Sequence, residues 1–216
     1  MLTMLEEIVL LAVDERTGKL RSSQRIGTGY AMGGALFFDL ALAGKIDTGT
    51  AEIQIVDAAP TGNAAMDHFL AEMAKQPELT TVRSWIQEAF GYRDYLEEFA
   101  LALLVERGVL RHETSRKLWL IDVNRFPTVD NKPVEHVRGR LAAAILTDAI
   151  PEPRDIMLVS VADASGLLEY VITREDVERR RERIGLLANL ETIGREVAEA
   201  IRFLDQNIRT ATPHLA

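Results

Sequence analysis

The most enzyme-like pattern in this sequence is a glycine-rich string, TGYAMGG at 28–34, with Asp47 eighteen residues after Gly29. In dehydrogenases a glycine turn of this kind holds the pyrophosphate of a dinucleotide, and a later acid binds the ribose. Such a turn follows a buried, β-branched strand, whereas the segment before this string is the polar run 21–26. A dehydrogenase-like enzyme is therefore one alternative, and a face of small residues at Gly29 and Gly33, on which another helix packs, is the preferred interpretation.

Other reactive side chains show no catalytic or metal-binding spacing. The chain has no cysteine, and its histidines occur singly, without the HxxxH or HExxH spacing of a zinc site. The four are His68, His112, His136 and His214. There is no Gly-x-Ser-x-Gly turn and no phosphate-binding loop of the Walker type. We therefore expect no catalytic residue, metal or cofactor.

Composition and charge limit the number of domains, the partners and the cellular location that we expect. Its 216 residues are enough for one domain with a substantial core, and no linker or repeat divides them. The net charge of −8 opposes diffuse attraction to nucleic acid, so no nucleic-acid partner is expected. Glu6 and Glu7 stand where a secretion signal needs basic residues, and no apolar run is long enough to span a bilayer. We expect a cytoplasmic protein, or one peripheral at the inner membrane surface.

A mainly α-helical fold around one central hydrophobic helix is expected. Thr3 and Glu6 form a capping box that opens a first helix. The apolar stripe of this helix consists of Leu5, Ile8, Val9 and Ala12. The segment 28–43 is apolar on nearly every side, with Asp39 as its only charge, and ends at Gly44. It predicts a central buried helix in which Leu36 and Leu40 are fully buried.

The remaining pattern predicts further helices and short hairpins. A hairpin is expected at 46–56, and another at 109–123 with the polar HETSRK as its turn. The helices are expected at 63–75, from Thr80 or Thr81 through Phe90, at 92–107, 134–146, 151–166 and 174–183. Trp85 is expected in the core. In the last helix, the pairs Glu175/Arg179 and Asp176/Arg180 predict a solvent face of salt bridges.

Seven strings in register resemble the Golgi phosphoprotein 3 family. They are LTMLEEIVLLAVDERTGKL, GALFFDLALAGKI, DAAPTGN, VRSWIQE, LVERGVL, DVNRFPTVD and ADASGLLEYVI, in this order over residues 2 to 170. The resemblance implies one Golgi phosphoprotein 3-like domain over 1–216, mainly helical and built around a hydrophobic helix. The chain resembles a bacterial-type member of the family, one without the basic N-terminal tail.

The family resemblance implies a function and also a difference from the family. Eukaryotic members are peripheral membrane adaptors that bind phosphatidylinositol 4-phosphate and hold glycosyltransferases in the Golgi. Their headgroup pocket has one tryptophan and three basic residues. Aligned on GALFFDLALAGKI and on the helix after Pro127, the equivalent positions here do not match this motif: they are Gln24, Gly33, His136 and Gly139.

We predict that nearby arginines replace the family's headgroup residues and form an anion site. Arg21 and Arg25 precede the central helix, and Arg138 and Arg140 flank the changed positions. The leading hypothesis is a non-catalytic protein that binds an anionic phospholipid headgroup or the cytosolic tail of a membrane protein. A cytoplasmic interaction scaffold without lipid binding is the alternative, beside the dehydrogenase considered above. The oligomeric state is left open.

Overall fold

The computed structural model describes residues 1–21, 25–49, 52–117, 121–190 and 192–211, with the side chains at 25, 115–117, 121–123 and 202–211 excepted. The described residues form ten α-helices and three two-stranded antiparallel sheets, so the mainly helical fold class is confirmed. The α-helices are α1 Met4–Ala12, α2 Arg25–Leu42, α3 Ala64–Lys75, α4 Val82–Gly91, α5 Arg93–Glu106, α6 Lys132–Leu146, α7 Pro153–Ala164, α8 Arg174–Arg179, α9 Arg181–Ala188 and α10 Thr192–Ala211. A short 3-10 helix, η2, follows α7 at Leu167–Tyr170.

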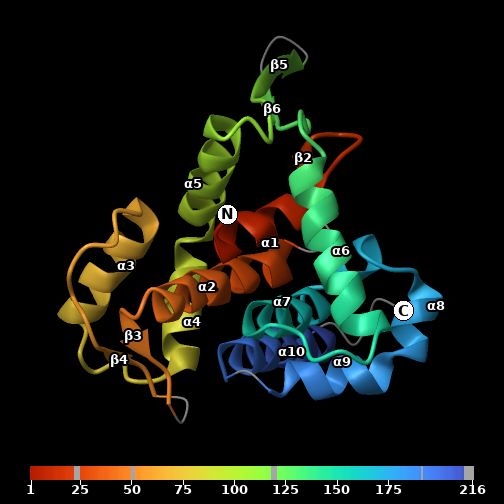
Figure 1. Ribbon diagram of the computed structural model, residues 1–216. Coiled ribbons are helices and arrows are strands. Elements are labelled where there is room, and N and C mark those ends of the chain that lie inside the picture. The colour runs from red at the N-terminus through yellow and green to blue at the C-terminus, as the bar shows by residue number, and fades with distance from the viewer. Residues whose placement is uncertain (22–24, 50–51, 118–120, 191, 212–216) are drawn as a thin grey trace.

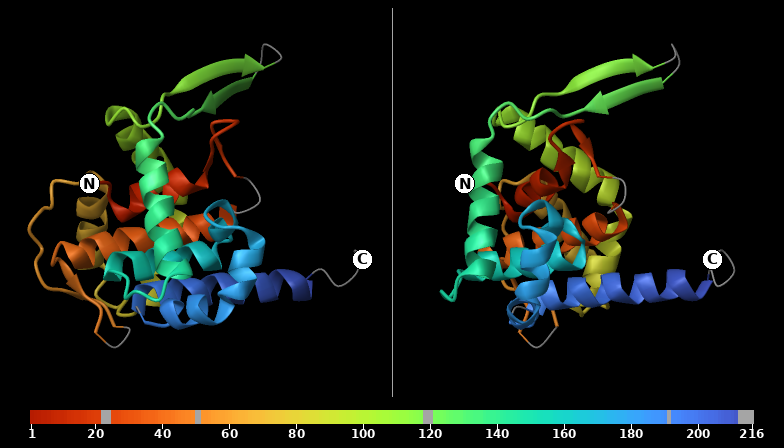
Figure 2. Two further views of the ribbon diagram at one scale, coloured as in Figure 1. Left: turned by 45° about the vertical axis from the view of Figure 1, so that its right-hand side comes forward. Right: turned by 90° about the vertical axis from the view of Figure 1, so that its right-hand side faces the viewer.

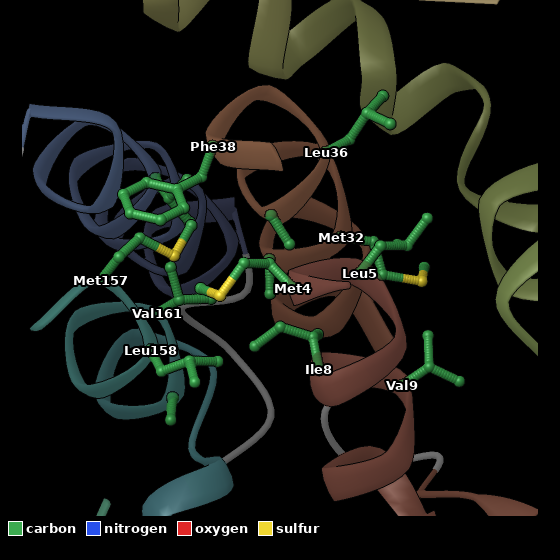
Figure 3. Packing of buried hydrophobic residues seen from close by; sticks show 14 of the residues in the cluster. Met4, Leu5, Ile8, Val9, Met32, Leu36, Phe38, Met157, Leu158 and Val161 are labelled. Atoms are coloured by element: carbon green, nitrogen blue, oxygen red, sulfur yellow. The ribbon is translucent and has the colours of Figure 1, made fainter. Parts of the chain in front are cut away.

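Helices α1 and α2 pack against each other at the centre, and other helices surround them (Figure 1). Methionine and branched side chains from α1, α2 and α7 meet in this core, as Figure 3 shows for Met4, Ile8, Met32, Met157 and Val161. Helix α4 covers α2 on one side, and α10 packs on both α7 and α2. The predicted central helix is confirmed, with Leu36 and Leu40 no more than 1% exposed.

Helix α1 is buried on all sides, whereas the sequence predicts only an apolar stripe. The capping box is confirmed: the Thr3 hydroxyl accepts from the Glu6 N–H, and the Glu6 carboxylate accepts from the Thr3 N–H. All nine residues of the helix are buried, including Glu6 and Glu7. These two acids therefore need partners inside the protein.

Most predicted helix boundaries agree with the structure within a few residues. Asn63 caps α3 and Thr81 caps α4, while Gly44 and Gly108 have positive φ just beyond α2 and α5. Trp85 is 1% exposed, so it lies in the core as predicted. Its indole N–H donates to the Leu79 carbonyl oxygen over 2.7 Å.

The strands are short, and the third pair differs from the prediction. The first two pairs are β1 Val13–Asp14 with β2 Lys19–Leu20, and β3 Ile46–Asp47 with β4 Gln54–Ile55. The third pair, β5 Glu113–Lys117 with β6 Ile121–Arg125, projects from the helical body (Figure 2). The polar HETSRK is therefore a strand and not a turn, because a projecting strand does not need apolar residues. Part of the predicted apolar strand, Leu118 to Leu120, lies outside the described residues.

The helix predicted at 174–183 is in fact two helices, α8 and α9, which meet at Arg180. Arg180 donates to the Leu146 carbonyl oxygen and pairs with Asp148 over 3.2 Å, so it supports the end of α6. Arg179 pairs with Asp176, three residues earlier. The predicted ladder of i,i+4 salt bridges is therefore wrong, because the backbone turns and Arg180 pairs with a distant segment.

The position of Leu40 predicts a large effect of truncation. Leu40→Ala should lower the free energy of unfolding by about 2 to 5 kcal/mol, because it removes burial and leaves a cavity. Leu42→Ala is a matched control on the same helix, since Leu42 is 56% exposed, and should change stability by less than about 0.5 kcal/mol. Urea unfolding of both variants measures the difference. Equal costs would show that α2 is not the core helix.

Candidate functional site

The start of α1 is buried, and its N–H groups need acceptors that water cannot supply there. Asp39 on α2 supplies two of them: its carboxylate accepts from the N–H of Met4 over 2.9 Å and of Leu5 over 3.2 Å. The Thr3 hydroxyl accepts from the next N–H, that of Glu6. The lone acid of α2 therefore caps another helix, a role that no local pattern in the sequence indicates.

Three arginines from three parts of the chain reach the two acids of this first turn. Arg107, just after α5, donates to Glu6 over 2.6 Å. Arg140 on α6 donates to both carboxylate oxygens of Glu7, over 2.8 and 3.1 Å. It also pairs with Asp155 over 2.9 Å. In α7, Arg154 pairs with Glu7 as well and donates to the carbonyl oxygen of Leu2 over 2.7 Å. We call these residues the α1 charge cluster: Glu6, Glu7, Arg107, Arg140, Arg154 and Asp155.

A pocket of about 630 Å³ lies beside the α1 charge cluster. Its polar lining includes Glu7, Arg107, Arg140 and the exposed His136. The cluster holds three arginines and three acids, so its formal charges balance. The pocket lining itself has Arg107 and Arg140 against Glu7, and any anion there would compete with Glu6 or Glu7 for the guanidinium groups.

A second group of basic residues gathers at the β1–β2 hairpin. Arg21 pairs with Asp14 over 2.7 Å, and its guanidinium lies 3.7 Å from the centre of the Tyr170 ring. Hydrogen bonds from Thr17, to which Arg21 adds, lower the pKa of the Asp14 carboxyl. Arg138 on α6 pairs with the neighbouring acid, Glu15. The hairpin thus brings Arg21 and Arg138 together from distant parts of the chain.

Two more cations on the same hairpin are exposed. Lys19 stands opposite Asp14 in the strand register and two residues before Arg21, so the three lie on one face. Arg16 lies in the turn, and within the described part of the chain neither Arg16 nor Lys19 forms an ion pair. We call these cations the hairpin face: Arg16, Lys19, Arg21 and Arg138. With two acids against four cations, it is locally positive on an acidic protein.

The predicted arginines therefore do not form a single site. Arg138 and Arg140, two positions apart on α6, contact different carboxylates, as expected for side chains about 200° apart around a helix. Arg140 belongs to the α1 charge cluster, while Arg21 and Arg138 belong to the hairpin face. The Arg25 side chain, at the start of α2, lies outside the described residues, and so does Gln24.

Of the remaining family-equivalent positions, Gly33 lies on α2, whereas His136 and Gly139 lie three residues apart on α6. Gly33 faces α4, where a Cβ built on it would come within 3.0 Å of the Ala89 Cβ. His136 lines the pocket beside the α1 charge cluster, and Gly139 is exposed on α6. As aligned from the sequence, these positions do not outline a shared pocket.

The glycine string lies inside helix α2 and not in a turn after a strand. A Cβ on Gly29 would come within 2.8 Å of Phe90, just as one on Gly33 would approach Ala89. The two glycines thus let α4 lie close to α2, which confirms the small-residue face. The dinucleotide turn required by a dehydrogenase is not formed here, because the string has a helical backbone.

Two features that bear on the class of protein are absent from the described residues. No helix among them is long and apolar enough to cross a bilayer. Nor do they contain a group of three or more histidines, acids or cysteines placed to hold a metal ion. The fold and these surfaces define a helical protein with a charge-paired core and a projecting hairpin.

Comparison with known proteins identifies the family. The model of the Golgi phosphoprotein 3 (GPP34) family matches residues 4–204, and the chain therefore belongs to that family. It is also 28% identical to the vacuolar protein sorting-associated protein 74 of Eremothecium gossypii over 215 aligned residues. This match covers 83% of the chain but only 64% of the relative, so the chain spans less than two thirds of that protein.

Asp39 predicts a specific pH dependence of stability. Burial, with a smaller contribution from Glu7, raises its pKa to about 6, although the bonds from Met4 and Leu5 and the charge of Arg154 oppose the rise. The ordinary pKa of an aspartate is 3.8, so the folded state binds the Asp39 proton more tightly than the unfolded state does. The stability that this proton gives to the fold is lost as pH rises through 6.

Between pH 5 and 8 the wild type should therefore lose roughly 1 to 1.5 kcal/mol of unfolding free energy relative to Asp39→Asn, which cannot titrate. Denaturant unfolding of both proteins at the two pH values measures this difference. Parallel pH profiles would mean that the Asp39 carboxyl is not perturbed by burial.

Proposed function

We propose that the protein is a non-catalytic adaptor that binds an anionic phospholipid headgroup through the hairpin face. The observation that carries this proposal is the local excess of cations at β1–β2, where Arg16 and Lys19 are exposed beside Arg21 and Arg138. Membership of the Golgi phosphoprotein 3 family supports an adaptor role. The name of the relative, a vacuolar protein sorting-associated protein, is consistent with work at membranes.

Electrostatics limits how such binding works. The net charge of −8 removes long-range attraction to an anionic bilayer, so the headgroup must be held by short-range, charge-assisted hydrogen bonds. Asp14 and the Tyr170 ring already orient the Arg21 guanidinium group. This lowers the entropy cost of forming hydrogen bonds from that group to a phosphate. Arg25 lies four positions after Arg21, and we include it among the proposed headgroup residues.

A scaffold without lipid binding is the second candidate, and one observation favours it. Each predicted arginine whose side chain is described already pairs with a carboxylate: Arg21 with Asp14, Arg138 with Glu15, and Arg140 with Glu7. A headgroup must then compete with these acids. Arg16 and Lys19 decide between the candidates, because among the described residues no carboxylate pairs with them.

Flotation with liposomes tests the lipid proposal. Vesicles with phosphatidylinositol 4-phosphate should carry the protein at low salt, where electrostatics is strongest, and binding should weaken as salt rises. Lys19→Ala and Arg16→Ala should each weaken binding by roughly 1 kcal/mol, or about fivefold, without a change in stability. Lys75→Ala is a control for charge, since Lys75 is exposed on α3, away from the hairpin in Figure 1.

Arg140 is not suitable for this test. It pairs with the buried Glu7, so Arg140→Ala should destabilise the fold by leaving Glu7 with Arg154 as its remaining arginine partner, whatever the role of Arg140 in binding. If the wild type ignores phosphoinositide and other anionic vesicles at low salt, the lipid proposal is wrong and the scaffold takes its place.

A further inference from the structure

A groove of about 500 Å³ runs between α5 and the base of the β5–β6 hairpin. One stripe of α5 forms its floor and one edge, with residues at positions i, i+3, i+4, i+7 and i+8 along the helix. They are Glu98, Leu101, Ala102, Val105 and Glu106. Two acids thus stand at the ends of an apolar floor, and eight residues of helix place them about 12 Å apart.

The opposite wall consists of residues at the base of the hairpin. The His112 ring stacks on Phe126, with centroids 5.0 Å apart and planes 12° from parallel. The imidazole Nε2 is also 3.1 Å from the Asn124 Oδ1. These contacts hold the His112 ring against Asn124 of β6 and Phe126 just after that strand. The wall is therefore built in advance of any ligand, which reduces the entropy cost of binding.

The two acids of the groove keep their charge available. Within the described part of the chain, neither Glu98 nor Glu106 forms an ion pair, and both are exposed. The arginines nearest in sequence to Glu106 have other partners: Arg107 pairs with Glu6, and Arg111 with Glu113. The groove is thus negative at both ends, in contrast to the α1 charge cluster, where acids and arginines balance.

We propose that this groove docks an amphipathic helical peptide segment with two basic residues about 12 Å apart and apolar residues between them. On such a segment, lysines or arginines at positions i and i+8 meet Glu98 and Glu106. Apolar residues at i+3, i+4 and i+7 then cover Leu101, Ala102 and Val105. The partner follows from this charge pattern, because an acidic or purely apolar segment would leave the two carboxylates desolvated without a counter-charge.

A designed peptide tests the groove directly. The probe is a fluorescein-labelled 14-residue helical peptide with lysines at i and i+8 and leucines at i+3, i+4 and i+7, and its control has glutamates in place of the lysines. Fluorescence anisotropy should show saturable binding of the lysine peptide at 50 mM salt and none of the glutamate peptide. Binding should weaken at 500 mM salt.

Substitutions in the groove locate the site. The double variant Glu98→Gln with Glu106→Gln should weaken binding of the lysine peptide roughly tenfold, whereas Glu78→Gln, an exposed acid elsewhere, should change it less than twofold. Ala102→Trp should weaken binding by at least fivefold, because the larger side chain occupies the floor. All these positions are exposed, and thermal melts verify that each variant folds.

Three results would overturn the proposal: no binding of the lysine peptide up to 1 mM, equal binding of both peptides, or unchanged binding by the double variant. The groove and the hairpin face share no lining residue, although the Phe126 N–H of the groove wall donates to the Gly18 carbonyl oxygen next to Lys19. Side-chain substitutions on each surface therefore test the two proposals separately. The double variant should still float with phosphoinositide liposomes if the lipid proposal holds. Likewise, Lys19→Ala should leave peptide binding unchanged.

Discussion

The buried first turn of α1 is the constraint on which the rest of the structure depends. Every residue of this helix is buried, so its leading N–H groups and its two acids must find partners within the protein. Asp39 accepts from the N–H groups, and Arg107, Arg140 and Arg154 neutralise the acids. These contacts tie α1 to α2, to the end of α5, to α6 and to α7, which sets the arrangement of the core helices around α1.

This constraint also decides which cations remain for function. Arg140 looks like a ligand residue in the sequence, yet it is occupied by Glu7 and Asp155. Among the exposed charges, two peripheral groups are considered for recognition: a positive one on the β1–β2 hairpin and a negative groove beside α5. An adaptor needs at least two separate surfaces, and opposite charge on them favours different partners. The buried charges serve the fold, and the exposed ones are available for recognition.

The sequence predicts local features well, because their causes lie within a few residues. The Thr3 capping box, the Asn63 cap and the glycine after α5 all depend on short-range hydrogen bonds or backbone freedom. The role of Asp39 and the division of the arginines between two places depend on contacts between residues far apart in the chain. The α8–α9 break has the same origin, since Arg180 contacts the end of α6. A lone acid in an apolar helix was the one available signal for Asp39.

A double-mutant cycle on Glu7 and Arg140 tests the central claim most directly. Glu7→Ala, Arg140→Ala and the double variant are compared with the wild type by denaturant unfolding. Each single variant leaves a buried charge with one partner fewer, since Glu7 keeps Arg154 and Arg140 keeps Asp155. Each should therefore cost up to about 3 to 5 kcal/mol, and the double should cost well below the sum. A coupling energy above about 1.5 kcal/mol is the predicted result. Additive costs, within about 0.5 kcal/mol, would contradict the claim that this buried pair organises the fold.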